Sequence, residues 1–226
     1  MAGTTRSPDG DGDAWVIKTD AAGRQVWAHT FGGDRWDYGL FVQQITDGGY
    51  VVAGQTRSSA DPSGDAWVIK LDVSGEEVWS RTFGGQEPDE AAGGFIVAGH
   101  TTSPSTYEAV GWLLKVDAAG DEVWSRTLSG TLASSAQQTR DGGYIAAGYV
   151  KSPVTGTDAW LSKVNASGDE AWSRTFGGPA DDSFESVQET RDGGYIVAGE
   201  TASFGAGGRD IWLIKTDALG QVPAQP

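Results

Sequence analysis

The chain has 226 residues, and its 31 acidic against 16 basic side chains give a formal net charge of -15 at pH 7. This acidity, without any run of lysine or arginine, excludes nucleic acid as the expected partner. The absence of cysteine excludes disulfides, thiolate metal sites and cysteine nucleophiles, and no apolar stretch reaches the ~20 residues of a membrane helix. An aspartate-rich, lysine-poor surface suits concentrated salt and predicts a halophilic source; an ordinary acidic secreted protein is the alternative.

Taken in chain order, the first feature is a segment, Asp13–Lys18, whose central tryptophan returns four times. These tryptophans are separated by 52, 45, 48 and 52 residues, and they are Trp15, Trp67, Trp112, Trp160 and Trp212. A second tryptophan follows each of the first four after twelve residues, and this set is Trp27, Trp79, Trp124 and Trp172. Repeats of about 50 residues are typical of solenoids and propellers.

Each repeat has the pattern of four short strands, and no segment has helical periodicity. First strands are expected at 40–46, 133–139 and 185–190, each followed by an Asp-Gly-Gly turn that predicts a type I′ hairpin. The second strand is represented by 50–54, and the third carries the first tryptophan. Asp20–Gly23 and its counterparts predict type I turns that end in a left-handed glycine, before a fourth strand.

These elements predict one all-β domain over 1–226, a β-propeller of about five four-stranded blades. The repeat units are 1–33, 34–85, 86–130, 131–178 and 179–226. Near-continuous apolar runs in the middle strands are expected where both faces of a sheet pack against neighbours. The unit 86–130 is expected to lack its first strand, and the terminal blades to be incomplete. A small closed ring and an open arc of a larger propeller both remain possible, and unpaired edges would favour a homo-oligomer.

A family resemblance follows from these motifs. Asp72–Trp79, with the pattern Asp-x-x-Gly-x-x-x-Trp, resembles the tryptophan-docking repeat of pyrroloquinoline-quinone-type β-propellers. The longer pattern, Trp-x-x-Lys-x-Asp with Trp-Ser-Arg-Thr-Phe-Gly-Gly and Asp-Gly-Gly-Tyr-Ile-Val-Ala-Gly, is similar to repeats of bacterial and archaeal surface or secreted proteins. The resemblance covers nearly the whole chain and implies a propeller at the cell surface or outside the cell, although Met1–Arg6 contains no apolar signal region. The quinone enzymes are similar in one motif only, and their adjacent-cysteine disulfide cannot form here.

The nine tryptophans in repeat register are interpreted as core rather than as stacking platforms for sugars or bases, because buried indoles remove a large apolar area from water. Trp36 lies outside the register, on a connection, and is the tryptophan most suited to contact a ligand.

Three aspartates follow a Gly-Gly pair by four residues: Asp37, Asp89 and Asp182. They could form a carboxylate cluster that binds a cation or a sugar, or they could cap turns. Asp9, Asp11 and Asp13 alternate as calcium ligands do, but the loop lacks the glutamate of an EF-hand, and a solvated hairpin loop is the alternative.

Five of the six lysines lie three residues after a tryptophan: Lys18, Lys70, Lys115, Lys163 and Lys215. Their stems are expected to pack along the sheet with the head paired to a carboxylate, rather than to form a cationic ring for an anionic ligand. Arg81, Arg126 and Arg174 are interpreted in the same way. His29 and His100 have no recognisable triad or metal partner in the sequence.

The patterns therefore favour a non-catalytic scaffold or binding module without a resident cofactor, whose partner is a protein or a glycan. The alternative is a fragment or relative of a propeller enzyme, either a glycan hydrolase or lyase or a quinone-dependent dehydrogenase. Carboxylates that act as a pair in glycoside hydrolysis meet in space and leave no signal in sequence.

Overall fold

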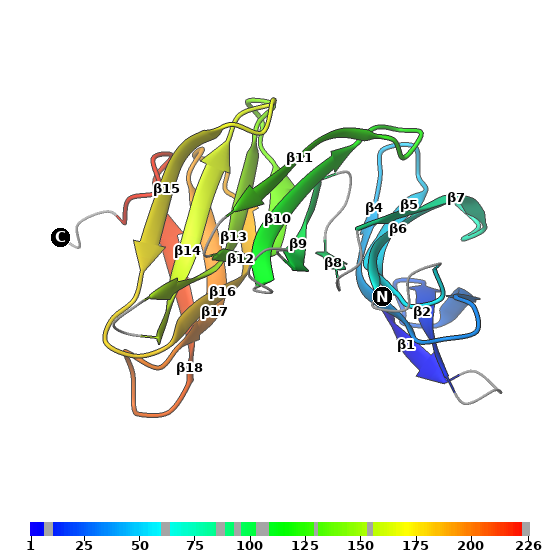
Figure 1. Cartoon of the computed structure of the whole chain (residues 1–226), viewed down its shortest axis with the longest axis horizontal. Helices are drawn as coiled ribbons and strands as arrows, with labels where there is room; N and C mark the ends of the chain where they lie inside the picture. The colour runs from blue at the N-terminus through cyan, green and yellow to red at the C-terminus, as the bar shows by residue number, and fades with distance from the viewer. Residues whose placement is uncertain are drawn as a thin grey trace. The chain divides into compact units, whose positions relative to one another are not determined.

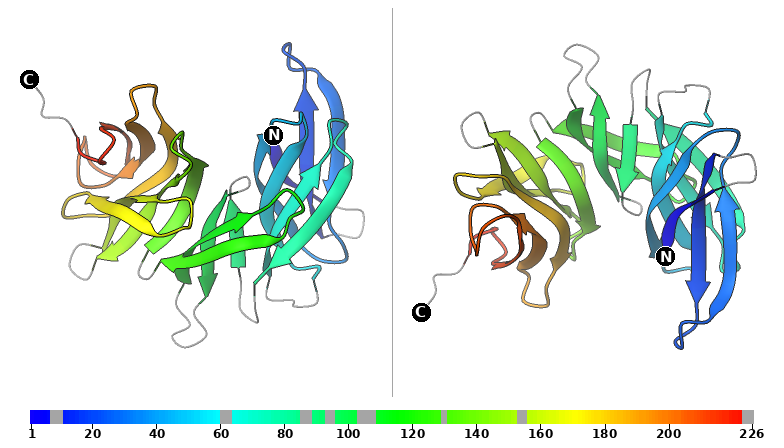
Figure 2. Two further views of the ribbon diagram at one scale, coloured as in Figure 1. Left: turned by 90° about the horizontal axis from the view of Figure 1, so that it is seen from above. Right: turned by 90° about the horizontal axis from the view of Figure 1, so that it is seen from below.

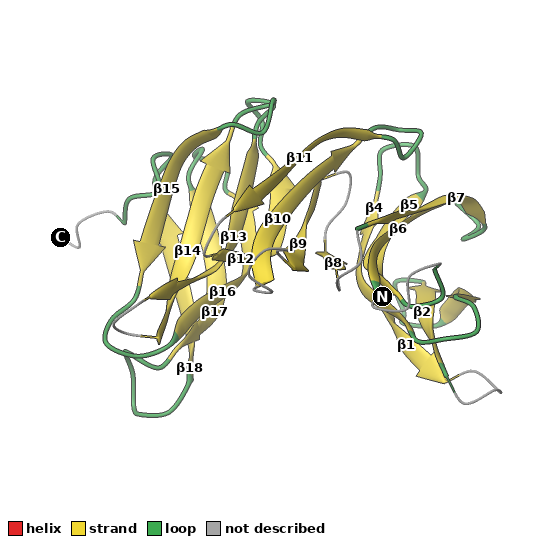
Figure 3. Cartoon of the chain, viewed as in Figure 1, coloured by secondary structure: helices red, strands yellow, loops and turns green. Residues whose placement is uncertain are grey.

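A computed structural model describes residues 1–6, 11–59, 64–84, 89–92, 96–102, 109–128, 131–152 and 156–222. Over these residues the chain forms eighteen strands and no helix (Figure 3). The strands make five small sheets, and each sheet lies within one of the five repeat units. The expected all-β class is confirmed. No apolar helix long enough to cross a membrane occurs among the described segments.

The chain divides into two compact units, the first made of residues 1–109 and 115–123. Sheet 1 has the order β1 (Ala2–Arg6), β2 (Gly12–Thr19), β3 (Gln25–Phe31). Sheet 2 has the order β4 (Asp37–Gln44), β5 (Tyr50–Thr56), β6 (Asp65–Leu71), β7 (Glu77–Phe83) (Figure 1). Sheet 3 has residues in both units and consists of β8 (Asp89–Ala92), β9 (Ile96–Thr102), β10 (Ala109–Val116) and β11 (Glu122–Leu128).

The second unit contains residues 110–114 and 124–226. Sheet 4 has the order β12 (Thr131–Gln138), β13 (Tyr144–Ser152), β14 (Gly156–Val164), β15 (Glu170–Phe176). Sheet 5 has the order β16 (Asp182–Glu189), β17 (Tyr195–Thr201), β18 (Asp210–Thr216). Sheets 4 and 5 lie face to face in both views of Figure 2, and β16 contacts three strands of sheet 4.

The core of each unit lies between consecutive sheets, which use their two faces in a fixed way. We define the forward face by the residues before and after the third-strand tryptophan, and the backward face by that tryptophan and the residue two positions later. The forward face of sheet 1, Ala14 and Val16, clusters with the backward face of sheet 2, Trp67 and Ile69. Sheet 4 packs on sheet 5 in the same manner. Strand alternation thus buries both faces of the middle strands, which explains their apolar runs.

The unit 86–130 has a first strand, contrary to the expectation. β8 is four residues long and pairs with β9, from Asp89 opposite Thr101 to Ala92 opposite Ala98. Its residues, Asp-Glu-Ala-Ala, are depleted in strands, so backbone pairing to a neighbour rather than propensity determines this element. The other first strands begin two or three residues earlier than expected, at Asp37, Thr131 and Asp182.

The Asp-Gly-Gly turns differ from the predicted type I′ geometry. Gly48 N donates to Ile45 O at 3.0 Å, Ile45 N donates to Gly49 O at 2.9 Å, and Gly48 has a φ of 88°. This pattern is a type I turn followed by a left-handed glycine, which suits a loop one residue longer than type I′ allows. The prediction for Asp20–Gly23 is confirmed, because Gly23 N donates to Asp20 O at 3.0 Å with a φ of 79°.

Candidate functional site

The fourth-strand tryptophans each lie on a turn glycine of the following sheet. The pairs are Trp27 with Gly75, Trp79 with Gly120, Trp124 with Gly168 and Trp172 with Gly220. The indole N–H of Trp79 donates to Ala118 O at 3.1 Å, and that of Trp124 donates to Ala166 O at 3.0 Å. A Cβ on Gly120 would lie 2.9 Å from the indole of Trp79, at a φ of 84°, so both space and backbone require glycine there. Each contact fixes one sheet to the next.

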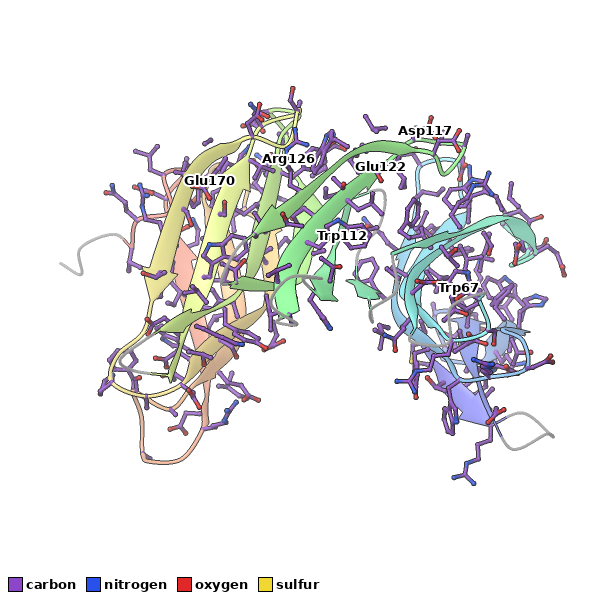
Figure 4. The ribbon with its side chains drawn as sticks, in the orientation of Figure 1. Trp67, Trp112, Asp117, Glu122, Arg126 and Glu170 are labelled. Carbon is purple, nitrogen blue, oxygen red and sulfur yellow. The ribbon has the colours of Figure 1, made fainter. Side chains whose placement is uncertain are left out.

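The residue two positions after each of these tryptophans supports the same junction. The guanidinium of Arg126, which Figure 4 labels, lies 5.7 Å from the ring centroid of Trp124, and its Nη2 donates to Ser167 O at 2.9 Å. Arg81 and Arg174 lie over Trp79 and Trp172 in the same way. The guanidinium groups thus lie over indole faces, and those of Arg81 and Arg126 also donate to turn carbonyls. The sequence predicted carboxylates as their main partners instead.

His29 occupies this arginine position in the first repeat, a correspondence that the sequence analysis missed. Its Nε2 lies 3.3 Å from Ser74 O in the next turn, and its ring lies 5.4 Å from that of Trp27. Counting two residues from each tryptophan would have found it. His29 therefore has a junction role, not one in a triad or a metal site.

Three of the repeated lysines pair with the aspartate of the Asp-Gly-Gly turn in their own sheet, which confirms the expected pairing for these residues. The Nζ to carboxylate distances are 2.9 Å for Lys70–Asp47, 3.0 Å for Lys163–Asp141 and 3.0 Å for Lys215–Asp192. Lys18 instead lies 5.4 Å from the ring centroid of Tyr50 in the next sheet.

These pairs keep the turn aspartates ionised. Hydrogen bonds from the hydroxyl of Thr139, the amide of Gly143 and the ammonium of Lys163 lower the pKa of Asp141 from 3.8 to about 2. The hydroxyl of Thr190 and the ammonium of Lys215 lower the pKa of Asp192 in the same direction.

Asp37 and Asp182 are buried at the start of the first strands of sheets 2 and 5. Asp37 accepts hydrogen bonds from Gly33 N at 2.9 Å and Ser58 Oγ at 2.7 Å, and also from the hydroxyl of Thr56. Asp182 makes the equivalent bonds to Gly178 N, Ser203 Oγ and the hydroxyl of Thr201. Burial alone would raise the pKa of Asp182, but the hydroxyls of Ser203 and Thr201 outweigh it and the pKa is lowered. This placement favours the turn-capping alternative over a cluster open to a cation or sugar.

The remaining predicted binding residues are placed as follows. Trp36 is half-buried, lies against Gly12 and stacks on Tyr38 with ring centroids 5.9 Å apart. Asp89 lies in β8, and Asp9 lies outside the described residues, so the proposed calcium ligands are described only at Asp11 and Asp13. Within the described part of the chain, no three histidine or acidic side chains gather in a group that could hold a metal ion.

Grooves between consecutive sheets form a feature that sequence reasoning did not find. In the second unit a groove of about 660 Å³ lies between sheets 4 and 5. Its lining includes Lys163 of β14, Trp172 of β15 and Tyr195 of β17. In the first unit a groove of about 320 Å³ is lined by the residues at the same repeat positions, Lys18, Trp27 and Tyr50. The grooves are therefore a recurring product of the repeat. We call the first the sheet 4–5 groove.

The charges of the sheet 4–5 groove are satisfied within the protein. Arg140 Nε lies 3.7 Å from a carboxylate oxygen of Glu189, and its Nη2 donates to Thr190 O at 2.8 Å. Lys163 is paired with Asp141. Burial, followed by the negative charges of Asp141 and Glu189, raises the pKa of Tyr195 to about 12, so its phenol stays protonated. The groove is lined by the half-buried ring of Trp172, by the largely buried Tyr195, by hydroxyl and amide groups, and by balanced charge.

Comparison with known proteins gives limited similarity. No protein family model matches the chain. The regulatory protein FlaEY of Caulobacter vibrioides is 28% identical over 95 residues, which are 36% of this chain and 10% of that protein. The match thus spans about a tenth of that relative's length. The crystal structure of Sqt1 from Chaetomium thermophilum aligns with a TM-score of 0.37 and 12% identity, over 100% of this chain and 79% of that one. The class that the described residues themselves define is an all-β repeat protein.

Proposed function

We propose that the five sheets are blades of a β-propeller and that the chain is a non-catalytic scaffold or binding module of a cell-surface or secreted protein. The propeller assignment is supported by the repeated junction, in which a fourth-strand tryptophan rests on a turn glycine of the next sheet. It is also supported by the packing of forward on backward faces in both units. Propeller blades stack in this sequential way.

The observation that carries the non-catalytic assignment is the use of the described repeat carboxylates within the protein, as turn caps and as partners of lysines. Among the described residues, every aspartate with a displaced pKa has it lowered, by hydrogen bonds from turn amides, hydroxyls, lysines or an arginine. A glycoside hydrolase needs a general acid whose pKa is raised. The repeated polar groups are thus used to stabilise turns and junctions, and the enzymatic alternative gains no support from them.

The sheet 4–5 groove is the proposed binding site, and its ligand is an uncharged glycan. Because Lys163 and Arg140 are already paired with carboxylates, a charged ligand would have to break these pairs and would gain little. A sugar presents hydroxyl groups, which complement the polar atoms that line the groove, and an apolar ring face, which can lie against the part of Trp172 that stays exposed.

A binding screen tests this proposal. Uncharged oligosaccharides are screened by saturation-transfer NMR in molar salt, which screens the charge of -15. We expect binding by the native chain and at least fivefold weaker binding by Arg140→Ala, which removes a groove residue. Arg24→Ala is the control, because Arg24 makes an exposed ion pair with Asp20 outside the groove. Turnover of aryl glycosides, or dye reduction dependent on a quinone, would overturn the non-catalytic assignment, and equal loss in both variants would overturn the site.

A further inference from the structure

Sheets 1 and 5 each leave one apolar face uncovered. On sheet 5 the forward face is open, with Ile211 91% and Leu213 65% exposed, whereas the equivalent Ala66 and Val68 are fully buried. On sheet 1 the backward face is open, and Trp15 is 38% exposed, whereas the equivalent Trp67 is buried. The two open faces are thus the two halves of one interface, the same forward-on-backward contact that sheets 1 and 2 form.

The turn of sheet 1 is open in the same way. Gly75, Gly120, Gly168 and Gly220 each lie against a tryptophan of the preceding sheet. At Gly23, the equivalent glycine of sheet 1, an added Cβ would meet nothing within 4 Å. Sheet 5 has three strands and presents no fourth-strand tryptophan among the described residues. Sheet 1 therefore has a turn glycine with no indole on it, and the described part of sheet 5 supplies no fourth-strand indole to cover it.

The residue before the third-strand tryptophan gives the specific argument. In the covered sheets this residue is small because the first strand of the next sheet lies close: Ala14 lies against Gly39, and Gly111 against Thr131. In sheet 5 the same position is Ile211. As far as the structure describes the chain, sheet 1 contains three strands and has none at the position that β4 takes in sheet 2. A large side chain at 211 can therefore be accommodated opposite sheet 1, where a sheet with a first strand would clash.

We propose that the forward face of sheet 5 binds the backward face of sheet 1 of a second copy of this chain, in head-to-tail association. The contact is heterologous, so it joins chains in series instead of in closed symmetric pairs, unless its rotation closes a ring of copies. The charge of -15 on each copy opposes contact at low ionic strength. Association is therefore expected to strengthen with salt.

Cross-linking tests the geometry directly, because the chain has no native cysteine. Ile17→Cys places a thiol on the backward face of sheet 1, and Leu213→Cys places one on the forward face of sheet 5. In molar salt, with one variant isotopically labelled, a short bis-maleimide is expected to link the two variants to each other and neither to itself. Dimers of Leu213→Cys alone would overturn the proposal in favour of a symmetric pair. In the double variant at high dilution, a cross-link within one chain would overturn it in favour of intramolecular closure.

Sedimentation equilibrium supplies the second readout. The native chain is expected to associate in molar salt, and Leu213→Glu to weaken the association constant at least tenfold, because the junction would bury a charge. Ile211→Ser provides an independent variant, and both changes lie at exposed positions where folding is retained, as circular dichroism will verify. Val78→Glu is the matched control, since Val78 is an exposed apolar residue of β7 away from both faces. A native chain that stays monomeric at high micromolar concentration in molar salt, or equal weakening by the control, would refute the proposal.

Discussion

Lys163 Nζ lies 3.0 Å from a carboxylate oxygen of Asp141, which links the third strand of sheet 4 to the turn between its first two strands. The same link recurs as Lys70–Asp47 and Lys215–Asp192. In each case the hydrogen bonds also hold the aspartate in its ionised form, so these turns are sensitive to acid.

The first prediction concerns pH. The pKa of Asp141 is about 2 in the folded protein against an ordinary 3.8, so the hydrogen bonds from Thr139, Gly143 and Lys163 contribute fully above pH ~4 and are lost as the pH falls through 2. Because Asp141 is largely solvent-exposed, its share is below about 1 kcal/mol. Urea titrations should show Asp141→Asn less stable than the native chain at pH 6 and equal to it near pH 2. A difference that grows on acidification would contradict this assignment.

The second prediction isolates the indole–glycine contact. Gly168→Ala introduces a Cβ 2.9 Å from the ring of Trp124 at a φ of 82°, so it combines backbone strain with a clash. Gly23→Ala has a similar φ of 79° but meets nothing within 4 Å, and is expected to cost only the ~1–2 kcal/mol of a left-handed residue. We expect the free energy of unfolding to fall by about 1–3 kcal/mol more for Gly168→Ala than for Gly23→Ala. Similar losses would show that the clash relaxes and that the indole position is not fixed.

The third prediction compares two equivalent tryptophans. Trp160 is buried between sheets and its Nε1 donates to Ser173 Oγ at 2.8 Å. Trp160→Ala should therefore lower the free energy of unfolding by about 3–5 kcal/mol. Trp15→Ala should cost much less in dilute, low-salt solution, where the backward face of sheet 1 is open. Chemical denaturation followed by circular dichroism measures both, and equal costs would contradict the exposure difference.

The fourth prediction addresses the buried carboxylates. Asp182→Ala leaves the Gly178 amide and the Thr201 hydroxyl without their acceptor, which should cost about 1–3 kcal/mol for each group that stays unsatisfied. Ser203 Oγ loses Asp182 but keeps Ala180 O at 3.2 Å as an acceptor. If these carboxylates cap turns, millimolar calcium will leave the melting temperature of the native chain unchanged. A calcium-dependent rise that disappears in Asp182→Ala would restore the cation-binding interpretation.

Much of the fold can be predicted from the sequence because its signals are local. The pattern Asp-x-x-Gly-x-x-x-Trp contains both partners of the junction, although the tryptophan rests on the glycine of the next repeat and not its own. Short-range periodicity likewise identifies the strands in which polar and apolar residues alternate and the strands that are apolar throughout. β8 could not be predicted because its four residues show neither alternation nor an apolar run. The strand forms by pairing with β9.

The grooves could not be predicted because they combine distant residues. The groove is lined by residues from three strands of two sheets, Lys163, Trp172 and Tyr195. In the sequence, each of them occupies an ordinary position of the structural repeat. Asp37 illustrates a case where spacing leaves two interpretations open: its position after Gly-Gly is compatible with a carboxylate cluster and with a turn cap, and in the structure the carboxylate accepts from the Gly33 amide and from Ser58. Both cases depend on side-chain direction, which spacing does not record.

Each contact between a fourth-strand indole and a turn glycine joins one repeat to the next repeat in the chain, and to no other. Recombination at matching codons of two repeats would therefore delete or insert a whole sheet and leave every surviving contact complete. In such a lineage the number of sheets can drift by single duplication events, with no new packing solution required. The genes of close relatives should then differ in length by steps of about 50 codons.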